Sequence, residues 1–250
     1  MTDLRYLLVG CPVFQRELEL VAAAAQPTIT LRWLEIGLHE RPSAALREAL
    51  QAAVDDAERA DVDAVLLGYG LCNRGLVGLM ARSRPVVIPR AHDCLGILLG
   101  STGRYLEQLE SEPGTYFQSA GWVEQSSLTG GISQPVFTLG PAARLSREAL
   151  AERYGEDNAD FLLEQLAALT SRYRRLAFID TPVQALEDRA EIARGLAEQR
   201  GWRFDRLPGD LGWLRRLVAG KWDEGEFQLL QPGERLVLRS DEGLIGAEPA

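Results

Sequence analysis

Residues Val86–Gly96 read VVIPRAHDCLG, and this stretch decides how the rest of the chain is interpreted. A short β-branched run, typical of a buried strand, ends at Pro89. Side chains that bind metals or carry out chemistry follow, and a helical pattern begins at about Cys94. In open α/β sheets, ligands bind in the crevice outside the carboxyl ends of the strands. The stretch therefore predicts both a strand of a parallel sheet and the place of a functional site.

Two earlier stretches repeat this arrangement of a strand, an exit loop and a helix. They are Leu7–Pro12 (LLVGCP) and Val65–Asn73 (VLLGYGLCN), and the three strand ends hold all three cysteines of the chain, Cys11, Cys72 and Cys94. Strands and helices alternate through the first 110 residues. This alternation predicts an α/β fold with a doubly wound, mostly parallel sheet in flavodoxin- or Rossmann-like layers.

The middle of the chain is less regular and predicts an insertion into this pattern. An extended stretch over 113–123 precedes a loop, 126–141, that is rich in Gly, Ser and Pro and is a candidate lid. Further parallel strands are predicted at 176–179 and 202–206. We expect a single α/β domain over 1–250, with a division into 1–125 and 145–250 around the loop as the alternative.

Composition and charge narrow the classes of partner and the compartment. The net charge of −9 and the pI of about 4.9 argue against nucleic-acid binding, which requires a basic face. No apolar run approaches the roughly 18–20 residues that span a bilayer, and the start lacks the apolar core of a signal peptide. The sequence therefore predicts a cytoplasmic protein without nucleic-acid or membrane partners, and it is compatible with a homo-oligomer. In a reducing compartment, its cysteines are expected to be thiols or ligands before disulfides.

The order of the strands determines whether the cysteines meet. The common order 2-1-3-4-5 places the first strand beside the third and the third beside the fourth, at spacings of about 4.8 Å. The exits with Cys11, Cys72 and Cys94 would then be adjacent, and His39 would follow the neighbouring second strand. Thiols at helix N-termini have lowered pKa values, and their thiolate forms bind metals or attack electrophiles.

The row of adjacent strand exits with these cysteines and histidines predicts a metal site, with zinc and an iron–sulfur cluster as the two candidates. No CxxC pair, the strongest sequence sign of a metal site, is present. The alternatives to a metal site are therefore that each cysteine or histidine has a structural role and that the protein binds no cofactor. Asp93 is equally an N-cap or a proton carrier. The candidate metal ligands are Cys11, Cys72, Cys94, His92 and His39.

The same exits supply candidates for catalysis and for binding. Cys72 and His92 are the candidate nucleophile and acid–base group, and Arg90 could hold a carboxylate or phosphate, with a surface salt bridge as the alternative. Three residues that flank Cys72 are the candidates for binding a cofactor: Tyr69, Asn73 and Arg74.

Four motifs together resemble a prokaryotic family defined by a domain of unknown function. They are Gly68–Cys72, Pro89–Cys94, Gly114–Phe117 with Gly121-Trp122, and Gly220–Asp223. The family is often encoded near corrinoid-dependent methyltransferases, which implies a corrinoid protein or a methyltransferase as a partner. The resemblance also implies that these positions form one site, and zinc-bound thiolate chemistry is common in methyl transfer.

A looser similarity is to enzymes of the quinolinate synthase type, which assemble one iron–sulfur cluster from three cysteines on separate α/β loops. Those enzymes draw the cysteines from three pseudo-repeated domains, whereas all three cysteines here lie before residue 95.

Three functions are compatible with the sequence. The favoured hypothesis is a metal- or iron–sulfur-binding α/β protein in one-carbon or corrinoid metabolism, whose open coordination position takes a small-molecule substrate or cofactor. The second is a metal-free, racemase-like enzyme with a cysteine nucleophile that acts on a small acid. The third is a non-catalytic protein that binds or carries a cofactor in the same crevice.

Overall fold

The computed structural model describes residues 3–38, 41–72, 74–128, 147–183, 187–240 and 243–250. Its contacts define two compact units. Unit 1 comprises Met1–Gln108, Thr181–Gln184 and Pro208–Ala250, and unit 2 comprises Leu109–Asp180 and Ala185–Leu207. The expectation of a single domain, or of a division around 126–141, stays a prediction, because contacts alone do not show whether either unit folds independently. Residues 126–128 of the predicted loop belong to a helix, and 129–141 lie outside the described residues.

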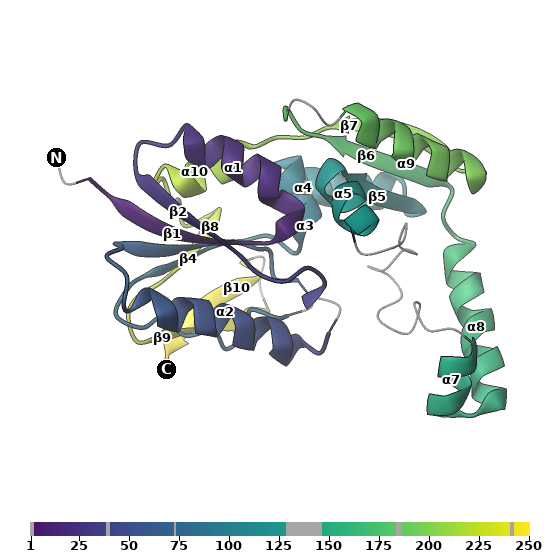
Figure 1. The fold of residues 1–250 in the computed structure, drawn as a ribbon, viewed down its shortest axis with the longest axis horizontal. Coiled ribbons are helices and arrows are strands. Elements are labelled where there is room, and N and C mark those ends of the chain that lie inside the picture. The colour runs from purple at the N-terminus through teal and green to yellow at the C-terminus, as the bar shows by residue number, and fades with distance from the viewer. Residues whose placement is uncertain (1–2, 39–40, 73, 129–146, 184–186, 241–242) are drawn as a thin grey trace. The chain divides into compact units, whose positions relative to one another are not determined.

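The core of unit 1 is a five-stranded sheet in the order β2-β1-β3-β4-β8 (Figure 1). The first four of these strands are parallel, and β8 is antiparallel to β4. The α/β class with a mostly parallel sheet is therefore confirmed, as is the predicted order of its first four strands. The strands are β1 (Arg5–Gly10), β2 (Thr28–Trp33), β3 (Ala64–Gly68), β4 (Val86–Pro89) and β8 (Phe227–Leu230).

Helices cover both faces of this sheet, as expected for a doubly wound fold. Figure 1 shows α1 and α10 on one face and α2 on the other. Every residue of β3 and β4 is buried, because a central parallel strand has helices on both sides. The helices of unit 1 are a 3-10 turn (Pro12–Phe14), α1 (Gln15–Ala23), α2 (Ser43–Ala57), α3 (Cys94–Leu99), α4 (Thr102–Ser111, whose residues 109–111 belong to unit 2) and α10 (Gly212–Val218).

Two segments of unit 1 depart from a simple alternation of strands and helices. The helical pattern that begins at Cys94 is divided into α3 and α4, because Gly100 ends α3 with a left-handed φ of 79°. Between β3 and β4, residues 74–78 form a turn in which Gly78 has a φ of 86°, and the Gly78 and Ala81 amides donate to carbonyls of a late strand.

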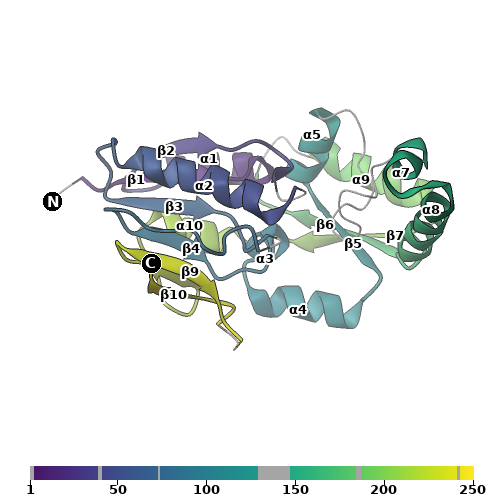
Figure 2. The ribbon, with the colours of Figure 1, turned by 90° about the horizontal axis from the view of Figure 1, so that it is seen from below.

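That late strand belongs to a C-terminal hairpin, which Figure 2 shows beside β4. The hairpin consists of β9 (Glu234–Leu238) and β10 (Ile245–Pro249), which pair in antiparallel fashion. The Gly78 amide donates to the Leu236 carbonyl at 2.8 Å, and the Leu236 amide donates to the Leu79 carbonyl at 2.8 Å. The hairpin thus becomes part of unit 1 through backbone bonds.

Unit 2 has its own three-stranded sheet in the order β5-β6-β7. The strands predicted at 176–179 and 202–206 exist, but they lie here and not in the main sheet, where β8 occupies the fifth position. The parallel pair β5 and β6 is covered by α5 and α9. The elements are β5 (Thr115–Ser119), α5 (Ala120–Leu128), α7 (Arg147–Tyr154), α8 (Glu156–Thr170), β6 (Arg175–Asp180), α9 (Glu187–Gln199) and β7 (Arg203–Pro208).

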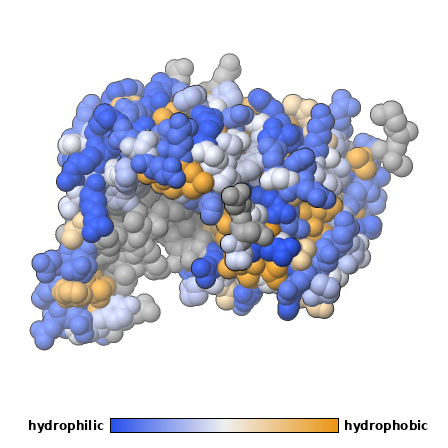
Figure 3. Space-filling model, turned by 180° about the vertical axis from the view of Figure 1, so that it is seen from behind, coloured by the Kyte–Doolittle hydropathy of each residue, from blue (hydrophilic) through white to orange (hydrophobic). Residues whose placement is uncertain are grey.

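The surface is mostly polar on the face that Figure 3 draws. Hydrophilic residues make up most of the face drawn in Figure 3, with apolar residues in separate groups. Among the described residues, no helix combines the length and the apolar character needed to cross a membrane.

Candidate functional site

The carboxyl ends of β1, β3 and β4 are joined by hydrogen bonds between their backbones. The Cys11 amide donates to the Gly68 carbonyl at 3.2 Å, which links the exits of β1 and β3. The Cys72 amide donates to the His92 carbonyl at 3.1 Å, and the Leu71 amide donates to the Ala91 carbonyl at 2.8 Å, which links the exits of β3 and β4. The three cysteine-bearing exits are therefore held together, as the strand order predicted.

The Cys11 and Cys72 thiols interact at this junction, and the Cys94 backbone contacts the Cys72 sulfur. The Cys72 sulfur accepts hydrogen bonds from the Gly70 and Cys94 amides, and Cys11 and Asp93 are close enough to disfavour a negative charge on Cys72. The Cys94 amide can donate in this way because it lies at the start of α3, where the first amides have no partner within the helix.

Burial sets the protonation state of these thiols. It raises the pKa of Cys11 from its usual 9.0 to about 11, against the smaller opposing effects of the Val13 amide and the Tyr69 hydroxyl. Although part of Cys72 is exposed, burial of its sulfur raises its pKa as well, and the neighbouring Cys11 and Asp93 add to the effect. The expectation of lowered thiol pKa values was therefore wrong for Cys11 and Cys72, because desolvation outweighs the amide donors.

Tyr69 closes the space between Cys11 and Cys72. The residue is 3% exposed, and its hydroxyl lies against the Cys11 thiol and 3.5 Å from the Gly10 carbonyl. Burial raises the Tyr69 pKa, and both thiols add to this effect. The tyrosine therefore stays neutral, and its hydroxyl can donate a hydrogen bond to a negatively charged Cys11 sulfur.

The loop that carries Cys72 has an unusual backbone. Cys72 has a φ of 40° and Arg74 a φ of 61°, in the left-handed region that residues with a side chain rarely adopt. Such conformations cost of the order of 1–3 kcal/mol and collect at functional sites. The Arg74 side chain is exposed, and Asn73 lies outside the described residues. The prediction that these two residues bind a cofactor is not tested by this geometry.

Gly70 lets the exit of β3 approach the exit of β4 closely. A Cβ at this position would lie 2.7–2.9 Å from three backbone atoms of Asp93. We expect Gly70→Ala to separate the two loops and to lower the free energy of unfolding by about 2–3 kcal/mol, as overpacking of a core does. Chemical denaturation measures this effect, and Gly195→Ala, at a helix position with open space, is the matched control. An unchanged stability of Gly70→Ala would contradict the close approach.

Asp93 is an N-cap residue, which was one of the two roles considered for it from the sequence. Its Oδ1 accepts hydrogen bonds from the Leu95 and Gly96 amides at 2.9 and 3.3 Å and so caps α3. Its Oδ2 accepts the Tyr105 hydroxyl at 2.7 Å, and burial, with Asp93 as the second cause, raises the Tyr105 pKa. Sequence reasoning missed Tyr105, because nothing in the spacing shows that α4 turns back toward Asp93.

The Arg90 side chain connects β4 to the end of the chain. Its guanidinium donates to the carbonyls of Glu224 and Phe227, to those of Gly243 and Ile245, and to the Gln228 side chain at 2.8 Å. These bonds join β4, β8 and the hairpin. The predicted role of Arg90 in catalysis stays untested, and the bonds give it an architectural role that the sequence did not reveal.

The predicted metal ligands are only partly described. The His92 side chain is exposed and lies along a cavity beside β8, and His39 is outside the described residues. Within the part of the chain that the structure describes, no three His, Cys, Asp or Glu side chains are placed to hold a metal ion as they stand.

The fold and the junction define an α/β protein with a cluster of thiols at the carboxyl ends of three parallel strands. The chain belongs to the DUF1638 family of proteins of unknown function, whose sequence pattern covers residues 33–218. The resemblance to a family defined by a domain of unknown function is thus confirmed. No curated protein and no solved structure is significantly similar to the chain. The match includes Cys72 and Cys94, and it excludes Cys11 and the C-terminal hairpin.

Proposed function

We propose that Cys11, Cys72 and Cys94 form a thiolate ligand set for a soft metal ion, either zinc or the iron of an iron–sulfur cluster. The observation that supports this most directly is the junction itself, where three separate strand ends bring every cysteine of the chain together. Three sulfur ligands leave one position of a tetrahedral ion open. A small-molecule substrate or cofactor would bind there, and the ion would act as a Lewis acid or activate a thiol.

The surroundings of the thiols fit this donor set. The enclosed sulfurs do not ionise readily by themselves, and a cation supplies the charge that stabilises their thiolates. The Gly70 and Cys94 amides already point at the Cys72 sulfur, and the Tyr69 hydroxyl points at Cys11. Donors of this kind orient metal ligands and tune the charge on them. The role of His92 or His39 as a fourth ligand stays a prediction.

A place in corrinoid or one-carbon methyl transfer is the finer part of the proposal, and only the family resemblance supports it. Activation of a thiol by zinc is compatible with such chemistry. A corrinoid protein or a methyltransferase is accordingly the proposed partner, and a pull-down with the purified partner candidates tests it.

Metal analysis tests the ligand set. We expect protein purified anaerobically without a chelating tag to contain about one equivalent of zinc, or iron with matching sulfide. We expect each of Cys11→Ala, Cys72→Ala and Cys94→Ala to weaken zinc binding about 100-fold, the share of one ligand in a typical site. Binding should release protons and should strengthen as the pH rises.

Tyr69→Phe is the comparison variant, because it removes a hydroxyl beside Cys11 without removing a sulfur. It should keep the metal stoichiometry of the wild type and should weaken zinc binding less than the loss of a sulfur does. Metal binding that survives in all three cysteine variants would contradict the proposal. Metal-free protein with one rapidly alkylated thiol would instead support the cysteine-nucleophile enzyme, although raised thiol pKa values suit that chemistry poorly. Absence of both results would leave the non-catalytic carrier.

A further inference from the structure

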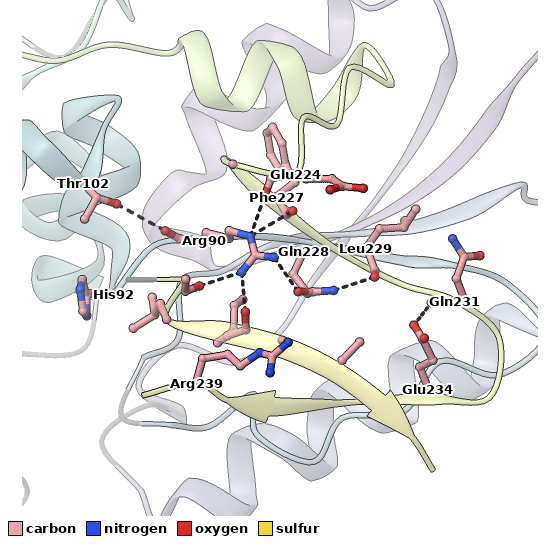
Figure 4. Close-up of a pocket in the computed structure, with 16 residues that line it drawn as sticks. Arg90, His92, Thr102, Glu224, Phe227, Gln228, Leu229, Gln231, Glu234 and Arg239 are labelled. Atoms are coloured by element: carbon pink, nitrogen blue, oxygen red, sulfur yellow. Dashed lines mark hydrogen bonds between the residues drawn. The ribbon is translucent and has the colours of Figure 1, made fainter. Parts of the chain in front are cut away.

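A second feature of unit 1 lies next to the cysteine junction. A cavity of about 730 Å³ lies between β8 and the hairpin, and its volume is within the usual range for small-molecule sites. Figure 4 shows Arg90 in the middle of this cavity, His92 and Thr102 on one side, and Gln231 and Glu234 on the other. No sequence pattern indicates this cavity, because its walls come from residues more than a hundred positions apart.

Arg239 is the side chain on this wall that is available for a ligand. It follows the last residue of β9, and within the described ranges its guanidinium has no hydrogen bond or ion pair. It lies across Gly246 of β10, where an added Cβ would be 2.4 Å from the Arg239 Nε. Because Gly246 has no side chain, the Arg239 side chain has room to lie along the cavity at this point.

The other charged groups limit the kind of ligand. The Arg90 guanidinium already donates to backbone carbonyls. The Glu234 carboxylate accepts a hydrogen bond of 2.7 Å from the backbone amide of Gln231. Glu224 also lines the cavity. Among the residues that the structure describes, two arginines and two glutamates therefore line the cavity. This balance disfavours a polyanion but leaves Arg239 able to hold one acid group in a two-point contact.

We propose that this cavity binds a small molecule with a single oxyanion group, a carboxylate or a phosphate, through Arg239. The molecule extends from Arg239 toward His92. The His92 carbonyl accepts the Cys72 amide at 3.1 Å, so that the cavity wall and the cysteine loop are directly connected. The identity of this molecule as the substrate of the metal site rests on the proposed function, whereas its binding to the cavity does not.

Binding of succinate and of inorganic phosphate to the full-length protein tests the inference, with uncharged succinamide as the control ligand. We expect Arg239→Gln to weaken binding of the oxyanion at least tenfold, because charge-assisted hydrogen bonds are lost. Gly246→Ala should weaken it as well, because the new Cβ displaces the guanidinium without removing it. Arg235→Gln is the matched control, since Arg235 is on the same strand but pairs with Glu248 at 2.6 Å.

Each outcome decides the question. Binding of either ligand that depends on Arg239 but not on Arg235 supports the site, and the better ligand identifies the acid group as carboxylate or phosphate. Absence of binding, or equal binding by wild type and Arg239→Gln, overturns it. Cys72→Ala separates the two proposals, because loss of metal with retained oxyanion binding shows that the cavity binds its ligand independently of the thiolate site. Oxyanion binding by a wild-type protein that holds no metal supports the cavity alone. Metal binding without oxyanion binding supports the thiolate site alone.

Discussion

Arg90→Ala is expected to lower the free energy of unfolding by about 3–5 kcal/mol, because it removes a charged donor from several partly buried acceptors at once. The guanidinium bonds to four backbone carbonyls and one amide oxygen, and it ties the strand before the cysteine loop to the end of the chain. Arg90→Lys keeps the positive charge but cannot reproduce the planar fork, so most of the loss should remain.

Denaturation in urea, followed by circular dichroism, measures this effect. Arg235→Ala is the control, since its bond to Glu248 links two residues of the hairpin surface and should contribute less than about 1 kcal/mol. An effect of Arg90→Ala no larger than that of the control would contradict the architectural role. Loss of activity with full stability would instead support the catalytic role that the sequence suggested.

The second large effect expected is a loss of stability in alkaline solution, measured on metal-free protein. Burial raises the pKa of Cys11 from its usual 9.0 to about 11. Below pH 9 the thiol is protonated in both the folded and the unfolded chain, and the full stability is present. Between pH 9 and pH 11 the unfolded chain loses this proton while the folded chain keeps it, so stability falls by about 3 kcal/mol for Cys11 alone.

The raised pKa values of Cys72 and Tyr69 act in the same direction and extend the fall to higher pH. Unfolding free energies measured from pH 8 to pH 11 show the slope. Cys11→Ala should be less stable at pH 8, since it loses packing, and should have a shallower slope above pH 9. Equal slopes for the variant and the wild type would show that Cys11 ionises as readily in the folded protein as in the unfolded chain.

Local patterns were sufficient for the elements around the site. The apolar runs before Cys11, Cys72 and Cys94 are strands, because an uninterrupted β-branched or leucine-rich segment is stable only between two layers of helices. The common strand order 2-1-3-4-5 then predicted that the ends of these strands are adjacent. The family resemblance, carried by motifs such as Gly68–Cys72 and Pro89–Cys94, was also readable from the residues alone.

The sequence by itself thus determined the α/β class, the order of four parallel strands and the meeting of three cysteine-bearing loops. Only the tertiary structure decided that 176–179 and 202–206 form a separate sheet and that β8 completes the first one. It alone decided that burial keeps the Cys11 and Cys72 thiols protonated, and that Arg90 bonds to carbonyls from the end of the chain. The physical reason is that strand and helix patterns reflect neighbours in the sequence, whereas sheet partners, desolvation and hydrogen bonds depend on residues far apart in the chain.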